Sequence, residues 1–496
     1  MNKVTLYILL LLFGSLGVTL KFSQSHEKMP IGCDEFGYLN MARNIRGENL
    51  SIVSERNYLK PLLDTLRSTS ITENEIAWMI TPHAYHLVPE TNKIINQYPP
   101  GTSLLLSIFP IELRQLVFPL ICIFILCLFT IIINSRSPDK SYNLFDLLFP
   151  AFIFLMMISA PFTTELSRIN SLAPTFGLLF AAGLLLSKNP LAAALLIGLS
   201  VNFRVVNALM LVPIVLFLPL KSIFNLANVR ENFVLLLKFG LISVAAALPL
   251  LFYNYIEMGN PFSITYSSID KAYNSETEIT NHVKYYFNID QLWFRIHIIG
   301  LALLIILNIS GKLSRSYVLA AASFVILNYL FFIFHAVKMD YYPYASAIIV
   351  LGFIGSILSS IKLNQKHTIF NKGIFIACTI IIFVIGGIRY LKKPHQTFEA
   401  SKQKYAALCR YDIVWGDLYS GTTEYVCNNN GFRYGTTTPR ARKIALSFLK
   451  SNNYKQAILL NDNIISEQTI LAEIQELGFK YTIINDVTIG KILIIK

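Results

Sequence analysis

Two acidic residues open a short helical pattern near the N-terminal end of the chain. Asp34 and Glu35 come directly before apolar residues at helical spacing, and Gly47 is typical of a helix end. The apolar positions are Phe36, Leu39, Ala42 and Ile45. Such a stripe predicts a short helix at a membrane surface. An acidic residue at its start can cap the helix, or it can act as a general base that takes the proton of a hydroxyl group.

A second segment, Tyr98-Pro99-Pro100-Gly101, precedes another apolar stretch. The prolines predict an extended entry into a helix start, where backbone N–H groups suit an anion. A plain junction between a loop and a helix explains the same residues. Tyr98 is nevertheless a candidate for binding a substrate, together with Glu35 and with Tyr38, which lies one helical turn after Asp34.

Three cationic residues stand at the predicted outer ends of apolar segments. They are Arg168, Arg204 and Lys338. Glu165 precedes Arg168 by three residues and could pair with it, and Tyr342 follows Lys338 closely. For Arg204, snorkelling to lipid headgroups is the alternative interpretation. Because the Arg side chain is well suited to phosphate, this set predicts a lipid-phosphate pocket open to the outer leaflet.

The histidine pair His83 and His86, with Glu90 nearby, has a spacing that indicates a metal site only weakly. The sequence has no P-loop, no G-x-G-x-x-G and no H-E-x-x-H pattern. Nothing therefore supports nucleotide-driven transport. The sequence therefore identifies no cofactor with certainty, and a divalent metal is possible but unsupported.

The composition is that of a membrane protein. Of the 496 residues, 54% are hydrophobic and only 14% are charged, with a mean hydropathy of +0.52. A soluble globular chain carries about 25% charged residues. This difference excludes a water-soluble enzyme and a nucleic-acid-binding protein, and the net charge of +13 is assigned mainly to membrane topology.

The hydropathy pattern predicts about eleven transmembrane helices. The expected spans are Val4–Leu20, Leu116–Ile133, Leu144–Ala160, Leu172–Leu186, Leu191–Phe203, Val205–Leu220, Phe233–Tyr253, Leu292–Ile309, Tyr317–Ala336, Tyr344–Ile361 and Ile374–Ile388. Lys and Arg residues concentrate in the loops that are cytoplasmic if the N-terminus is inside. We therefore expect a multi-pass protein of the inner (plasma) membrane with a cytoplasmic N-terminus. The long loops 21–102 and 254–291 then lie outside.

The residues after the last predicted span read as a separate domain. We expect residues 1–390 to form the transmembrane domain and residues 391–496 to form a periplasmic or extracytoplasmic α/β domain. Its expected helices are Ala441–Leu449 and Glu467–Leu477, and its expected strands are Gln456–Leu460, Tyr481–Asn485 and Lys491–Ile495. Cys409 and Cys427 lie in this exported part, where a disulfide is permitted, but the sequence leaves their pairing open.

Several of these motifs together resemble the GT-C membrane glycosyltransferases over about residues 1–390. The similarity is to the bacterial relatives of dolichyl-phosphate-mannose protein mannosyltransferases and of lipid A aminoarabinose transferases, which are family-39-like. The motifs are Asp34-Glu35 after the first span, Tyr98-Pro99-Pro100-Gly101 before the second, Ser167-Arg168, Gly259-Asn260-Pro261-Phe262, and the segment from Lys338 to Pro343. Ala173 stands where mannosyltransferases carry an acid, and Lys338 stands in place of the usual Arg.

The resemblance implies an inverting transferase that works on the outer membrane face. It implies a sugar carried on a polyprenyl phosphate, with Asp34 as the base and with Arg168, Arg204 and Lys338 stabilising the departing lipid phosphate. The acceptor would be a cell-envelope glycan, a lipid or a protein. Other interpretations are a flippase or transporter for lipid-linked sugars, a polysaccharide polymerase or ligase, and a membrane anchor for the tail. A transporter predicts repeats and charges at mid-membrane, which the sequence lacks.

Overall fold

The described residues fall into two compact units. In this computed structural model they are 33–48, 59–88, 93–110, 113–114, 117–118, 120–122, 124–126, 128, 169–217, 229–263, 279–311, 313–335, 339–359, 403, 405–463, 465–486 and 489–496. Those within 115–251 and 273–393 form a helical unit. Those within 25–114, 252–272 and 394–496 form a mixed unit of helices and strands. The first long loop thus shares a unit with the tail, which the sequence did not indicate.

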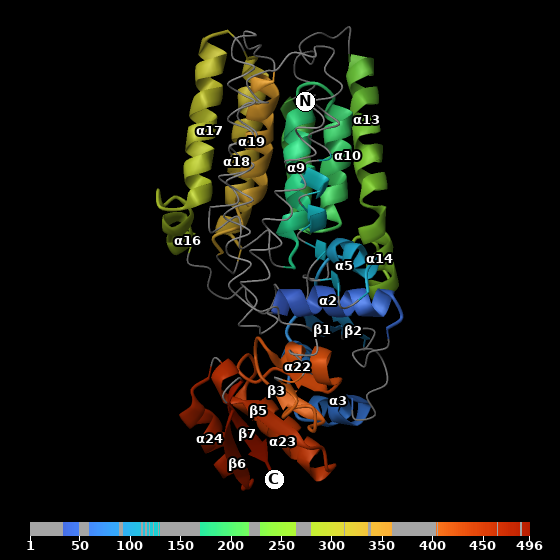
Figure 1. The fold of residues 1–496 in the computed structure, drawn as a ribbon, viewed down its shortest axis with the longest axis vertical. Coiled ribbons are helices and arrows are strands. Elements are labelled where there is room, and N and C mark those ends of the chain that lie inside the picture. The colour runs from blue at the N-terminus through green and yellow to red at the C-terminus, as the bar shows by residue number, and fades with distance from the viewer. Residues whose placement is uncertain are drawn as a thin grey trace, which may run out of the picture. The chain divides into compact units, whose positions relative to one another are not determined.

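The helical unit is a bundle of apolar helices (Figure 1). Its elements are α9 (Leu172–Leu185), α10 (Pro190–Val201), η2 (Val205–Leu211), α11 (Val212–Phe217), α13 (Val229–Ala246), α16 (Ile279–Tyr286), α17 (Leu292–Ile309), α18 (Arg315–Ile333) and α19 (Tyr344–Leu358), and α13 continues into α14 (Leu248–Met258). Helix α19 packs on α9 and α17, and α10 packs on α9 and α13. A Cβ on Gly352 would lie 2.2 Å from the carbonyl oxygen of Phe180, so this glycine permits the close approach of α19 to α9.

Two of the described helices are long and apolar enough to cross a membrane, and a bent pair adds a third. Helices α17 and α18 confirm the predicted eighth span and most of the ninth. Shorter apolar helices occupy the predicted fourth, fifth, sixth and tenth spans. The expected spans Val4–Leu20, Leu144–Ala160 and Ile374–Ile388 lie outside the described residues, as does part of the second. The total of about eleven is therefore not confirmed.

The predicted seventh span is not one straight helix. It is broken between α13 and α14 with a bend of 55°. Pro249 lies in the first turn of α14, where its ring and missing N–H interrupt the helical hydrogen bonds. The Asn202 amide spans the break, since its Nδ2 donates to the carbonyl oxygen of Ala246 at 2.7 Å and its Oδ1 accepts from the N–H of Leu250 at 2.9 Å. The Asn202 side chain thus replaces the direct hydrogen bond between the Leu250 N–H and the Ala246 carbonyl oxygen.

The mixed unit contains the five-stranded sheet β4-β3-β5-β7-β6 (Figure 1). Strands β3 (Ile413–Trp415), β4 (Asn430–Phe432) and β5 (Gln456–Leu459) are parallel, whereas β7 (Gly490–Ile495) pairs antiparallel with β5 and β6 (Tyr481–Asp486). Its helices are α22 (Ser420–Cys427), α23 (Pro439–Ser451) and α24 (Glu467–Glu476). The predicted α/β tail is confirmed for α23, β5, α24, β6 and β7. The short strands β3 and β4, and α22 between them, were not predicted.

The first long loop supplies the other elements of the mixed unit. They are α2 (Cys33–Ile45), α3 (Leu59–Arg67), α4 (Glu73–Met79), the hairpin β1 (Tyr85–Val88) and β2 (Lys93–Asn96), and α5 (Gly101–Ser107). Arg433 joins them to the tail: its guanidinium donates to the carbonyl oxygens of Pro82 and Tyr85 and lies 4.2 Å from the Trp78 ring centroid. Because Arg433 is fully buried, these contacts offset part of the cost of placing its charge away from water.

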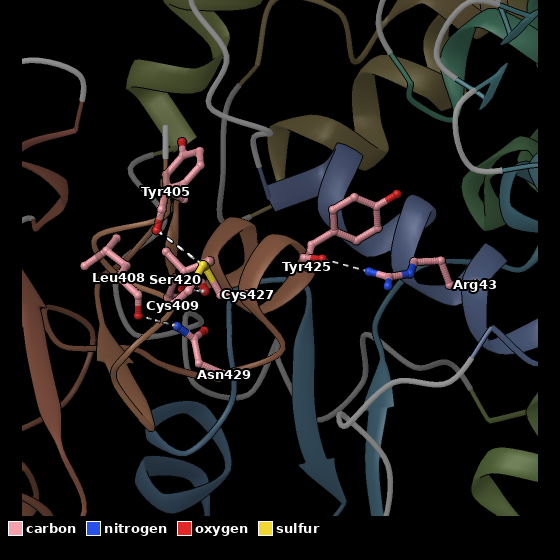
Figure 2. The surroundings of a disulfide bond; sticks show 9 residues. Arg43, Tyr405, Leu408, Cys409, Ser420, Tyr425, Cys427 and Asn429 are labelled. Carbon is pink, nitrogen blue, oxygen red and sulfur yellow. Dashed lines mark hydrogen bonds between the residues drawn. A yellow bond between two sulfur atoms is a disulfide. The ribbon is translucent and has the colours of Figure 1, made fainter. Parts of the chain in front are cut away.

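A disulfide joins Cys409 to Cys427 within the mixed unit (Figure 2). The sequence had left this pairing open. Beside the bridge, Asn429 Nδ2 donates to the carbonyl oxygen of Leu408 at 3.2 Å. Two residues before Cys427, in the last turn of α22, the carbonyl oxygen of Tyr425 accepts from Arg43 at 2.7 Å. Helix α22 is therefore tied both to the segment before β3 and to α2.

We expect the substitution Asn202→Ala to destabilise the helical unit. It leaves a buried carbonyl and a buried N–H without partners, which costs about 1–3 kcal/mol for each unsatisfied group. The midpoint of thermal unfolding in detergent measures the effect. Asn189→Ala is the matched control. Asn202 is the C-cap residue of α10, and Asn189 caps the exposed start of that helix through a single side-chain bond to Ala192 N–H. An equal or smaller loss for Asn202→Ala would contradict the role assigned to it.

Candidate functional site

Helix α2 places Asp34 in its first turn, as the sequence predicts. The Asp34 side chain is half-buried, and so is that of Glu35. Tyr38 lies one turn further along the helix and is buried, with its ring centroid 4.8 Å from that of Tyr98. Three predicted substrate-binding or catalytic positions, Asp34, Tyr38 and Tyr98, are thus brought together although Tyr98 is distant in sequence.

The contact between Asp34 and Tyr98 orients the Asp34 carboxylate. Tyr98 donates its hydroxyl hydrogen to Asp34 Oδ1. Cys33 Sγ also reaches Oδ1, at 3.4 Å. Burial raises the pKa of the Cys33 thiol, and the neighbouring Asp34 raises it further, so Cys33 remains a thiol that can donate. Within the described part of the chain, both donors use Oδ1, and Oδ2 is left without a hydrogen-bond partner.

Close packing at Gly37 holds this arrangement. A Cβ on Gly37 would lie 2.6 Å from ring carbons of Tyr98 and 2.8 Å from the Cβ of Ala84. Asn96 secures the same place, since its Nδ2 donates to the carbonyl oxygen of Gly37 at 2.7 Å and its Oδ1 accepts from the Tyr98 N–H at 2.8 Å. The tyrosine therefore reaches Asp34 because no side chain stands between the helix and its ring.

The apolar stripe of α2 packs against protein. Phe36, Leu39 and Ala42 are buried, and only Ile45 of the predicted stripe is exposed. The Phe36 ring lies 5.6 Å from that of Tyr85 and fills the space over Gly421, where a Cβ would be 2.2 Å from it. The helix was correctly predicted, but tertiary contacts with the hairpin and the tail account for the stripe that had suggested a membrane surface.

The predicted helix start after Pro99-Pro100 is confirmed by α5. Pro100 is the N-cap residue and provides no side-chain cap. Ser103, in the first turn, is buried and donates its hydroxyl hydrogen to the carbonyl oxygen of Tyr38 at 3.0 Å. The Pro-Pro-Gly segment thus docks α5 on α2, one turn from Asp34.

In the helical unit, Arg204 lies among tyrosine rings. Its guanidinium carbon is 5.5 Å from the ring centroid of Tyr341, 5.3 Å from that of Tyr342 and 5.8 Å from that of Tyr344. We call these four residues the arginine–tyrosine cluster. Aromatic rings around a guanidinium stabilise its charge. A half-buried arginine in this setting can bind an anion such as phosphate.

The cluster is fixed by the helices around it. Arg204 is the N-cap residue of η2, and its carbonyl oxygen accepts from Asn207 N–H at 3.0 Å. The Tyr344 hydroxyl bonds the Thr175 hydroxyl on α9. The Tyr342 ring stacks on Phe332 with 4.4 Å between centroids. Helices α9, α18 and α19 therefore each position one part of the cluster.

The sequence indicated Arg204 and Tyr342 as site residues, but not Tyr341 and Tyr344. The run Tyr341-Tyr342-Pro343-Tyr344 was a usable signal, but its contact with Arg204 depends on the packing of η2 against α19. The predicted residues Glu165, Arg168 and Lys338 lie outside the described residues.

The histidine pair does not form a metal centre with the side chains that the structure describes, among which no group of three potential ligands occurs. His83 and His86 lie in the mixed unit near Arg433. Burial, and then the charge of Arg433, lower the pKa of each imidazole to about 3. Both are therefore neutral at physiological pH. Glu90 lies outside the described residues.

The fold of the chain matches a solved structure, that of ArnT from Cupriavidus metallidurans bound to undecaprenyl phosphate. The TM-score is 0.53 at 11% sequence identity, and the match covers 98% of this chain and 97% of that chain. At this identity the likeness establishes a shared fold. No protein-family model matches the chain, and no curated protein sequence matches it.

We expect Gly37→Ala to disturb the Asp34 site directly. The added methyl must displace the Tyr98 ring or α2, and overpacking of this kind costs about 1–3 kcal/mol. Thermal unfolding in detergent measures the loss. Gly240→Ala is the control, because Gly240 is also helical and a Cβ there meets no atom within 4 Å. A Gly37→Ala protein as stable as the Gly240→Ala protein would show that the close packing at Tyr98 is not required.

Proposed function

We propose that this protein is an inverting GT-C glycosyltransferase of the cell membrane. It transfers a sugar from a polyprenyl phosphate to a hydroxyl of an extracytoplasmic acceptor, which is a cell-envelope glycan, a lipid or a protein. The observation that carries the proposal is the Asp34 carboxylate, oriented by Tyr98 with one oxygen left for another proton donor. The shared fold with ArnT supports it.

Asp34 is the general base in this proposal. Its Oδ2 accepts the proton of the acceptor hydroxyl while that hydroxyl oxygen attacks the anomeric carbon. The bond between the anomeric carbon and the phosphate oxygen breaks, and its electron pair leaves with the lipid phosphate. Tyr98 and Cys33 bind only Oδ1, so they orient the carboxylate without competing for the incoming proton.

Arg204 binds the lipid phosphate and stabilises the charge it gains on departure. Three tyrosine rings hold the guanidinium and stabilise its charge in a partly buried place. Arginine provides paired N–H donors that match phosphate oxygens, which a lysine cannot do. Arg168 and Lys338 are further candidates for the same task, and Glu165 and Tyr342 for binding the sugar or the phosphate.

The ArnT structure that shares this fold contains undecaprenyl phosphate. We therefore assign a sugar carried on a polyprenyl phosphate as the donor. We also assign the protein a multi-pass location in the inner membrane. The N-terminus is cytoplasmic and the tail domain extracytoplasmic in this proposal. The energy for transfer comes from the glycosyl phosphate bond of the donor, so the reaction needs no nucleotide site.

We expect Asp34→Asn to abolish transfer with normal membrane insertion, because the amide cannot take up the hydroxyl proton. A general base contributes about 10²–10⁴-fold to rate. Mass spectrometry of lipid-linked sugars and envelope glycans in cells checks this: a polyprenyl-phosphate sugar should accumulate both without the gene and with the variant. Asp64→Asn, at an exposed site on α3, is the control and should restore normal glycans. Full activity of Asp34→Asn would exclude Asp34 as the base. A transporter, by contrast, would move the lipid-linked sugar without cleaving it from the phosphate.

We expect Arg204→Ala to weaken binding of undecaprenyl phosphate to the purified protein by at least about tenfold, since hydrogen bonds to charged groups contribute about 1.5–3 kcal/mol. Arg204→Lys keeps the charge but loses the paired donors, and it should recover only part of the affinity. The control is Arg295→Ala, an exposed arginine on α17 that donates to the carbonyl oxygen of Asp290. An unchanged dissociation constant for Arg204→Ala would exclude Arg204 from the phosphate site.

A further inference from the structure

A hydrogen-bonded network of polar side chains lies inside the helix bundle and reaches the backbone of the arginine–tyrosine cluster. His297 on α17 is 1% exposed, Asn328 on α18 is fully buried and Ser346 on α19 is fully buried. His297 Nδ1 lies 3.1 Å from the Tyr329 hydroxyl, and its Nε2 lies 2.9 Å from Ser346 Oγ. Placing such groups among apolar helices is costly, so the set requires an explanation.

The direction of each hydrogen bond in this network follows from the hydrogens that its atoms carry. Ser346 Oγ has one hydrogen, which it gives to the carbonyl oxygen of Pro343 at 3.1 Å. It accepts from Asn328 Nδ2 at 2.9 Å. Its remaining lone pair must then accept from His297, which places the imidazole hydrogen on Nε2. In the neutral ring Nδ1 is an acceptor, and it receives the Tyr329 hydroxyl hydrogen.

This hydrogen-bonded network ends at the carbonyl oxygen of Pro343, in the backbone that carries the cluster tyrosines. Pro343 lies between Tyr342 and Tyr344, two of the three tyrosines around Arg204. Ser346 is the point where α17 and α18 are both connected to that backbone, since its hydroxyl bonds His297, Asn328 and the Pro343 carbonyl. Removal of its partners would release the carbonyl at the start of α19.

The residues before Pro343 are also connected to His297, through Tyr286 and Tyr329. The N–H of Met339 donates to the Tyr286 hydroxyl at 3.3 Å. The Tyr286 ring meets that of Tyr329 edge to face, with 6.2 Å between centroids. Tyr329 in turn lies 5.2 Å from the His297 ring. The segment from Met339 to Ser346 is thus fixed at both of its ends through the surroundings of one buried histidine.

We propose that His297 is a positioning residue for lipid-phosphate binding. Through Ser346 and the Pro343 carbonyl it holds Tyr342 and Tyr344 around Arg204, and so it sets the geometry in which the guanidinium meets the phosphate. The inference rests on the proposed function of Arg204. His297 touches neither donor nor acceptor, and its neutral Nε2–H form is the one that the network requires.

The test compares three variants for binding of undecaprenyl phosphate in detergent. His297→Ala and Ser346→Ala should each raise the dissociation constant by roughly fivefold or more, since each removes at least one buried hydrogen bond of about 1 kcal/mol. His297→Gln retains one N–H donor and one acceptor and should recover most of the affinity. Ser243→Ala is the control, because its buried hydroxyl bonds the Phe239 carbonyl within α13, a helix that carries no residue of the cluster.

Coupling to Arg204 separates positioning from general destabilisation. In an Arg204→Ala background, His297→Ala should have no further effect on the dissociation constant, because the group it positions is gone. Independent, additive losses would overturn the proposal, and so would wild-type affinity in His297→Ala. If Ser243→Ala weakens binding as much as Ser346→Ala does, the effect is one of global stability and the proposal also fails.

A second measurement does not depend on the ligand. Hydrogen–deuterium exchange should become faster at the backbone amides of residues 344–347 in His297→Ala and Ser346→Ala, and it should stay slow in His297→Gln. Unchanged exchange would overturn the positioning role even if the protein bound no lipid. If wild-type protein does not bind undecaprenyl phosphate while exchange changes as expected, the proposed function fails and the structural link between His297 and the tyrosines stands.

Discussion

Polar groups inside the helix bundle must find their partners in protein, because surrounding apolar side chains offer none. Two of the described side chains, Asn202 and Ser346, find partners in a way that also fixes a backbone position. Asn202 replaces a hydrogen bond that Pro249 breaks, and it thereby sets the bend between α13 and α14. Ser346 gathers bonds from two helices onto the Pro343 carbonyl. The tyrosines about Arg204 are held as a consequence of that satisfaction.

The mixed unit depends on close contacts between segments that are remote in sequence. Gly37 admits the Tyr98 ring, and Gly421 admits the Phe36 ring. Arg433 from the tail satisfies carbonyl groups of the loop between α4 and β1. Asp34 is therefore presented by a helix whose other face is packed on α22 of the tail. The tail domain contributes to the shape of the carboxylate site without supplying the carboxylate.

The shared fold with ArnT extends over nearly the whole chain, although only 11% of residues are identical. A bundle of apolar helices accepts many sequences as long as small residues occupy the close contacts and polar groups are satisfied. Gly352 against Phe180 and Asn202 across the bend are two such requirements in this chain. Function does not follow from the fold in the same way, and the function proposed here depends on Asp34 and Arg204.

The sequence alone determined the apolar helices, the helix beginning at Asp34, the helix start after Pro99-Pro100 and most of the α/β tail. These features depend on local spacing, on proline and on capping residues, which act within one or two turns. It did not determine the bend at Pro249, the three-residue strands β3 and β4, or the grouping of the first loop with the tail. A short strand has too few residues for a period, and a bend depends on a partner such as Asn202. The pairing of Tyr98 with Asp34, and the enclosure of Arg204 by Tyr341 and Tyr344, were decided only by tertiary structure, because each contact joins segments whose separation along the chain carries no signal of their approach.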